Sequence, residues 1–209
     1  MLIWLPLLAF ILLYRLLGCT PRAADGGRNP HAFVEACLAS GVILWAITEV
    51  LSLVNGLTTA GVAVAWGLVC GGLFWRLRQR SSVSAAGENN AIAVSQEADD
   101  GMAAWSRWAI ASGLIILAVL GLAGGYFYPP NSPDAVEYHF PRALHHMQNQ
   151  NVAHYPTHIL RQVQFPPWSE YALVHSQLLG GGWHRLAGAV QWVAWVLLFG
   201  VAASSARAM

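Results

Sequence analysis

The side chains best suited to chemistry lie in one stretch of the sequence, residues 133–158, which separates long apolar runs. It reads PDAVEYHFPRALHHMQNQNVAHYPTH and combines carboxylates, tyrosines, an arginine and five histidines. A carboxylate held at a membrane face can act as a general base, because it can reach both a lipid-linked substrate and a polar acceptor. Asp134 has this position. The alternative is that Asp134 caps a helix, a role for which Asp is favoured and which Glu137 would complete as a capping box. The spacing alone favours the cap.

The composition is typical of a membrane protein. Of the 209 residues, 56% are hydrophobic and 10% are charged, whereas soluble domains carry about 25% charged residues. Uncharged runs at 50–75, 108–133 and 186–206 are each long enough to cross a hydrocarbon core of about 30 Å. Segments 1–17 and 32–54 are two further candidates. We therefore predict an all-α, polytopic membrane protein with about five transmembrane helices. The sequence contains no basic patch that would bind nucleic acid.

The arginines indicate a topology and a division of the chain. Two groups flank the first and the third connection between helices: Arg15, Arg22 and Arg28, and Arg76, Arg78, Arg80 and Arg107. The positive-inside rule places both connections in the cytoplasm, so that loop 129–183 lies outside a bacterial inner membrane. The predicted parts are an N-terminal three-helix part (1–75), a cytoplasmic linker (76–107) and a second membrane part (108–209) that carries the outer loop.

The outer loop contains two helical patterns. The first has an apolar stripe at helical spacing, Val136, Phe140, Leu144 and Met147, and a second face with Asp134, Tyr138, Arg142 and His145. This pattern predicts an amphipathic helix in the membrane interface, with its apolar side toward lipid and its polar side toward protein or solvent. Pro141 must kink it. A second short helix, also interfacial, is expected at 167–179, begun by Pro166–Pro167 and ended by Gly180, after an ordered loop at 149–165.

The basic side chains of the loop have two possible roles each. Arg142 and Arg161 could grip a phosphate, because arginine offers fixed donors to phosphate oxygens, or they could contact ordinary lipid headgroups. His154 and His158 have the spacing of two metal ligands on a helix, but Pro156 interrupts that helix. We favour histidines that hydrogen-bond within a polar pocket, and we predict no metal site.

Two acids outside the stretch also have open roles. Glu170 is either a second polar contributor to the site or an acid in the first turn of its helix, where it stabilises the helix dipole. Glu49 lies toward the outer end of an apolar segment, and an acid in such a position is a functional candidate. Interhelical hydrogen bonds involving Thr48 or Ser52 neighbours would explain Glu49 as well.

The outer loop resembles the first outer loop of polyprenyl-phosphate-dependent membrane glycosyltransferases of the GT-C class. This group includes the protein O-mannosyltransferases and the lipid A aminoarabinose transferases. The resemblance is carried by Asp134, Tyr138-His139, Arg142, His145, Gln148-Asn149, the run from His154 to His158, and Pro167 with Glu170. Residues 48–52, TEVLS, are also similar to an element of that group. Many relatives have a second acid directly after the Asp, whereas this chain has Ala135, with Glu137 as the nearest acid.

The resemblance implies a fold of many transmembrane helices and transfer of a sugar from a polyprenyl-phosphate donor to an acceptor at the outer face. It implies that Asp134 is the base that deprotonates the acceptor. Candidates for substrate binding are Glu137, Tyr138, His139, Arg142, His145, His158, Arg161 and Glu170. Because family members usually have more helices, we expect the chain to be such an enzyme or its N-terminal part. Membrane lipid is the other expected partner, and neither the acceptor nor a divalent metal can be identified.

Two other classes of function stay open. One is a non-catalytic polytopic subunit that positions a partner through the outer loop. The other is a transporter or metal-handling membrane protein that uses Glu49 and the outer histidines. A chain of five helices without an internal repeat gives little room for alternating access, which argues against the transporter.

Overall fold

The computed structural model describes residues 2–18, 29, 31–84, 104–128, 132–182 and 186–207. All regular structure within these residues is helical. In chain order the helices are α1 (Trp4–Gly18), α2 (Ala32–Leu53), α3 (Thr59–Ser84), α4 (Ala104–Phe127), the π-helical turn η1 (Ala135–His139), α5 (Phe140–Asn149), α6 (Arg161–Gln164), α7 (Trp168–Gly180) and α8 (Ala187–Arg207). The predicted linker 76–107 begins within α3 and ends within α4. Its residues 85–103, and Arg22 and Arg28 of the first connection, lie outside the described residues.

Four helices are long and apolar enough to cross a membrane: Ala32–Leu53, Thr59–Arg80, Trp108–Phe127 and Ala187–Ser205. These spans confirm the prediction of an all-α membrane protein. The fifth span, expected at 1–17, stays a prediction. α1 is apolar but has only 15 residues, about 22 Å at 1.5 Å per residue, against a hydrocarbon core of about 30 Å.

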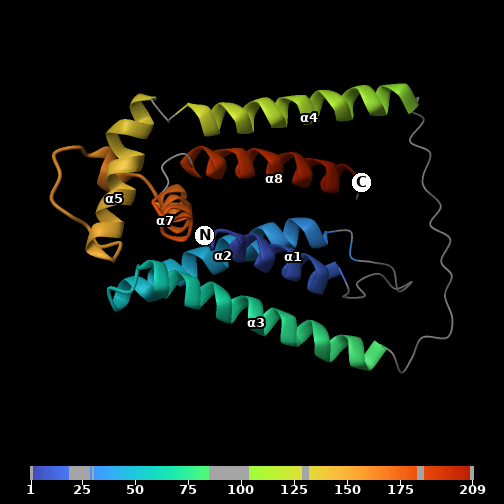
Figure 1. Ribbon diagram of the computed structural model, residues 1–209, viewed down its shortest axis with the longest axis horizontal. Helices are drawn as coiled ribbons and strands as arrows, with labels where there is room; N and C mark the ends of the chain where they lie inside the picture. The colour runs from blue at the N-terminus through green and yellow to red at the C-terminus, as the bar shows by residue number, and fades with distance from the viewer. Residues whose placement is uncertain are drawn as a thin grey trace.

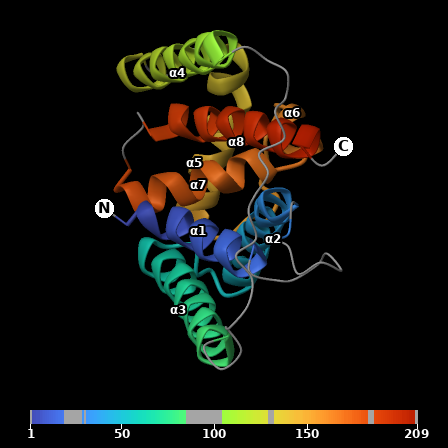
Figure 2. The same cartoon turned by 90° about the vertical axis from the view of Figure 1, so that its right-hand side faces the viewer.

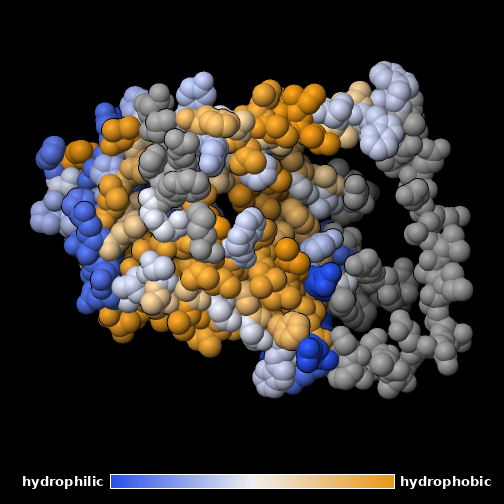
Figure 3. Space-filling model, viewed as in Figure 1, coloured by the Kyte–Doolittle hydropathy of each residue, from blue (hydrophilic) through white to orange (hydrophobic). Residues whose placement is uncertain are grey.

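The axes of the long helices are roughly aligned, and the outer-loop helices lie at one end of them (Figure 1). α4 and α8 form one side of the bundle and α1, α2 and α3 the other, while α5 crosses the end (Figures 1 and 2). Hydrophilic side chains gather over α5 and again at the far end of α3, with an apolar zone between them (Figure 3). The molecule therefore has two polar ends separated by an apolar belt, which is the pattern of a protein that crosses a bilayer.

α7 is buried in the middle of this arrangement. It lies between α8 and the group of α1, α2 and α3, and it contacts α2, α3, α5 and α8 (Figure 2). The predicted helix at 167–179 is confirmed at Trp168–Gly180, and it ends at Gly181, whose φ of 77° favours glycine. We expected the loop helices to lie in the membrane interface, but most residues of α7 are buried. Val174 and Leu179 belong to the hydrophobic core, and the Leu179 carbonyl accepts a hydrogen bond from the Leu2 amide at 2.8 Å.

The proline-bearing helix of the loop is divided as expected. η1 and α5 meet at Phe140, and Pro141 follows in the first turn of α5, where its ring interrupts the hydrogen bonding of the continuous helix. The predicted polar face of this helix turns inward at Tyr138 and Arg142, which are buried. The apolar stripe is split: Val136 and Leu144 are exposed, whereas Phe140 and Met147 pack against the core.

Candidate functional site

The first part of the candidate site is an exposed cluster of three charged side chains, Asp134, Glu137 and Arg161. Arg161 Nη1 lies 3.6 Å from Asp134 Oδ1 and 3.6 Å from Glu137 Oε2. More than half of each side chain is exposed: 64% of Asp134, 55% of Glu137 and 55% of Arg161. Exposed pairs of this kind contribute about 0–1 kcal/mol. The two carboxylates and the guanidinium can therefore exchange their contacts for contacts with a ligand.

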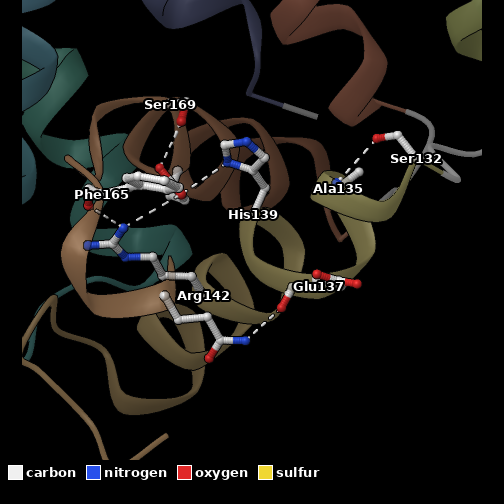
Figure 4. Close-up of polar contacts among 9 residues, drawn as sticks. Ser132, Ala135, Glu137, His139, Arg142, Phe165 and Ser169 are labelled. Carbon is white, nitrogen blue, oxygen red and sulfur yellow. Dashed lines mark hydrogen bonds and ion pairs between the residues drawn. The ribbon is translucent and has the colours of Figure 1, made fainter. Parts of the chain in front are cut away.

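The interpretation of Asp134 as a helix cap is wrong. Asp134 has helical dihedrals, φ −62° and ψ −41°, and its side chain makes no capping hydrogen bond. An N-cap residue normally leaves the helical region and accepts from an amide two or three residues later. Ser132 has taken that role, since its Oγ accepts from the Ala135 amide at 3.2 Å (Figure 4). The carboxylate of Asp134 is thus free of a local structural task.

A buried network lies beneath this cluster and centres on Glu170, which has 0% exposure. Its Oε1 accepts a hydrogen bond from His139 Nδ1 at 3.0 Å and lies 3.8 Å from Arg142 Nη1 (Figure 4). Its Oε2 accepts from Ser169 Oγ at 2.8 Å. A carboxylate only accepts, so His139 carries its proton on Nδ1. Glu170 is therefore a contributor to this polar region, beyond its place in the first turn of α7.

Arg142 and Arg161 have different surroundings, which separates the two phosphate candidates. Arg142 is 4% exposed, and its Nη1 donates to the Phe165 carbonyl at 2.6 Å (Figure 4). A side chain so placed joins α5 to α7 and does not lie among lipid headgroups. Arg161 remains open to solvent beside the two acids. The geometry therefore favours Arg161 as the group that could meet a phosphate.

Gln162 is a structural member of the site that the sequence did not reveal. Pro141 has no N–H, so the carbonyl of Glu137, four residues earlier, lacks its usual helical donor. Gln162 Nε2 donates to that carbonyl at 2.7 Å (Figure 4). Gln162 Oε1 accepts from Tyr155 Oη at 3.1 Å and from Thr157 Oγ1 at 3.0 Å. The proline indicated an unsatisfied carbonyl, but nothing in the sequence indicated which side chain would satisfy it.

The remaining loop histidines have three different surroundings. His145 stacks on Tyr155 with ring centroids 4.0 Å apart, and His154 and His158 are exposed on a segment without regular structure. In the described part of the chain, no group of three or more His, Cys, Asp or Glu side chains could hold a metal ion. His146 is buried, and neither of its ring nitrogens has a hydrogen-bond partner among the described residues.

Burial shifts the ionisation of two groups near the site. The pKa of His146 is lowered to about 4, first by burial and then by the Arg142 guanidinium. His146 is therefore neutral at pH 7. The pKa of Tyr138 is raised, first by burial and then by the charge of Asp134. Tyr138 therefore keeps its proton and can act only as a neutral hydrogen-bonding group.

A second polar layer joins α7 to the spans α2 and α3. Trp66 Nε1 donates to His175 Nδ1 at 3.0 Å, and His175 Nε2 lies 3.0 Å from Thr48 Oγ1. Trp can only donate, so His175 is neutral and carries its proton on Nε2. Tyr171 Oη donates to Glu49 Oε1 at 2.7 Å. Glu49 thus makes an interhelical hydrogen bond, as one of its two open roles required, and the partner comes from α7.

Of the predicted residues, the structure thus brings Asp134, Glu137 and Arg161 together at the surface, and His139, Arg142 and Glu170 together beneath it. Tyr138 lies between the two groups in η1, while His145 and His158 lie farther along the loop. An exposed carboxylate beside a guanidinium can accept a proton while the cation holds a negatively charged group. Comparison with protein-family models, curated proteins and solved structures gives no match for this chain.

Proposed function

We propose that this chain is a membrane glycosyltransferase, or the N-terminal part of one, that transfers a sugar from a polyprenyl-phosphate donor to an acceptor. The proposal combines the resemblance of the outer loop to GT-C enzymes with the state of one side chain. Asp134 is exposed, free of a capping role and close to Arg161. This observation carries the proposal, because a base must be free to take a proton beside the group that holds the donor.

In the proposed reaction, Asp134 removes the proton from the acceptor hydroxyl. The resulting oxygen nucleophile attacks the anomeric carbon of the sugar. The bond from that carbon to the phosphate oxygen breaks, and polyprenyl phosphate leaves with the bonding electrons. Arg161 stabilises the negative charge on the departing phosphate, where a fixed cation has its largest effect. Glu137 contacts the same guanidinium as Asp134 and keeps Arg161 in place when no substrate is bound.

The reaction would take place at the polar end that carries α5, which we assign to the outer face of a bacterial inner membrane. Two observations support this orientation. Exposed arginines gather at the opposite end, at the ends of α1 and α3, as the positive-inside rule requires of a cytoplasmic face. Asp134 also follows α4 closely, so that its carboxylate lies near the level at which a lipid-borne phosphate would enter.

The test is sugar transfer by membranes that contain the chain, with a panel of radiolabelled polyprenyl-phosphate sugars as donors. Asp134→Asn should reduce transfer by about 10²–10⁴-fold, the usual effect of losing a general base. Glu137→Gln is the matched control, since Glu137 has similar exposure and the same arginine partner. It should lower transfer by no more than about tenfold, because Glu137 holds Arg161 but does not take the proton from the acceptor. Equal activity of wild type and Asp134→Asn would reject the base, and absence of transfer with every donor would favour a non-catalytic subunit.

A further inference from the structure

The polar end opposite the candidate site carries a group of exposed arginines. Arg76, Arg78 and Arg80 lie at the end of the α3 span and Arg15 in the last turn of α1, and all four are exposed. In the view of Figure 3, hydrophilic side chains gather at the end of α3, beyond the apolar belt. We call these four residues the arginine ring.

Two contacts hold the ring in a defined place. Arg80 Nη1 donates to the Leu16 carbonyl at 3.3 Å, which joins the end of α3 to the end of α1. The last carbonyls of a helix have no partner within it, so a guanidinium satisfies both their hydrogen bonding and their negative dipole. The Arg78 guanidinium lies over the Phe74 ring, 4.7 Å from its centroid. This contact orients the cation against the helix.

The three arginines of α3 lie on different sides of the helix because they are two residues apart in the sequence. At 3.6 residues per turn, positions 76 and 80 share one side of a helix, while position 78 lies nearly opposite. Trp75, 64% exposed, and Phe74, 48% exposed, stand at the same level. Exposed aromatic side chains of this kind are typical of the membrane–water interface. The arginines therefore lie at the depth of lipid headgroups rather than in bulk solvent.

The charge at this end is not balanced by carboxylates of the described residues. Glu35 in the first turn of α2 is the described acid nearest to this end, and it accepts a hydrogen bond from Asn29 Nδ2 at 3.0 Å. At the other end, by contrast, Arg161 faces two acids and Arg142 lies beside Glu170. Counted over the described residues, the two ends thus differ in net charge, and among these residues only the arginine ring groups several exposed guanidinium side chains without a carboxylate partner.

We propose that the arginine ring binds the headgroups of anionic phospholipids. Guanidinium groups suit this ligand because they donate to phosphate oxygens in a fixed geometry. Each basic side chain near an anionic bilayer surface favours binding by about fivefold at room temperature. The inference does not depend on the proposed sugar transfer, since it concerns the opposite face of the protein.

Trp75 makes the proposal measurable, because brominated lipid in contact with it quenches its fluorescence. The protein would be placed in phosphatidylcholine vesicles with increasing amounts of brominated phosphatidylglycerol, and the contribution of Trp75 obtained by difference from Trp75→Phe. Wild type should bind phosphatidylglycerol at least about tenfold more strongly than phosphatidylcholine. The Arg76→Gln/Arg78→Gln/Arg80→Gln triple variant should lose this preference. Arg161→Gln, at the other end, should keep it.

Wild type alone provides a second readout that does not depend on the folding of the triple variant. Raising NaCl to 1 M should abolish most of its preference for phosphatidylglycerol, because screening weakens exposed ion pairs. Inorganic phosphate should act no more strongly than chloride of equal ionic strength. Three results would overturn the proposal: no preference in wild type, the same preference in the triple variant, or specific displacement by inorganic phosphate, which would identify a site for the free anion.

Discussion

Glu170 is predicted to be the acid on which the stability of the outer loop depends most. It is fully buried and is the anion nearest to the buried Arg142, with a separation of 3.8 Å. Glu170→Gln would keep the shape and allow a hydrogen bond to Ser169, but it would leave the Arg142 cation without its counterion. Breaking a buried ion pair from one side costs about 3–5 kcal/mol. Because part of the hydrogen bonding is retained, we expect a loss of about 3 kcal/mol.

The assay is thermal unfolding of the purified protein in one detergent, followed by tryptophan fluorescence, to which Trp168 in the first turn of α7 contributes. A loss of about 3 kcal/mol corresponds to a fall in Tm of roughly 6–12 °C for a chain of this size. Glu137→Gln is the control, because it removes an equal charge from an exposed pair and should lower Tm by no more than roughly 3 °C. A Glu170→Gln protein that unfolds within about 1 °C of wild type would refute the reasoning.

Three further predictions concern the polar contacts around α7 and the loop. The pKa of His175 is lowered to about 4 by burial, so the unfolded chain takes up its proton first as pH falls. The contribution of His175 to the free energy of unfolding should therefore be constant above about pH 6.5 and fall by up to about 3 kcal/mol toward pH 4. His175→Gln should remove this part of the slope in unfolding measured at several pH values, and the part that His146 contributes should remain. Gln162→Ala should increase amide hydrogen exchange across η1, whereas the same change at exposed Gln164 should not. Tyr171→Phe should destabilise the protein by about 1–2 kcal/mol, because Glu49 loses its donor, and the same unfolding assay would detect it.

The sequence predicted the helix boundaries best where proline or glycine residues stand at the ends of a helix. Pro166–Pro167 and Gly180–Gly181 bound α7 closely, because proline and glycine restrict or permit specific backbone conformations. It predicted less well what surrounds a helix. An apolar pattern does not distinguish a helix in the interface from one buried within a bundle, so the central position of α7 was missed. For α1, composition alone left its length open, and the structure ends it at Gly18.

Prediction of the site failed where two residues competed for one role. Asp134 and Ser132 both suit an N-cap, and only the backbone conformation shows that Ser132 accepts the amide hydrogen bond. Arg142 and Arg161 were equivalent in sequence, but burial separates them. The partners of Gln162 and Glu49 come from elements distant in the chain. Such tertiary pairs leave no periodic signal in a single sequence.

The most direct test of the central claim is chemical rescue of Asp134→Ala. Sugar transfer would be measured for the purified, reconstituted chain with and without added formate, at equal amounts of folded protein. If Asp134 is the base, the variant should lose at least about 100-fold in rate, and formate should restore part of that rate without accelerating wild type. A variant that transfers sugar within about twofold of wild type in the absence of formate would contradict the assignment of Asp134 as the base.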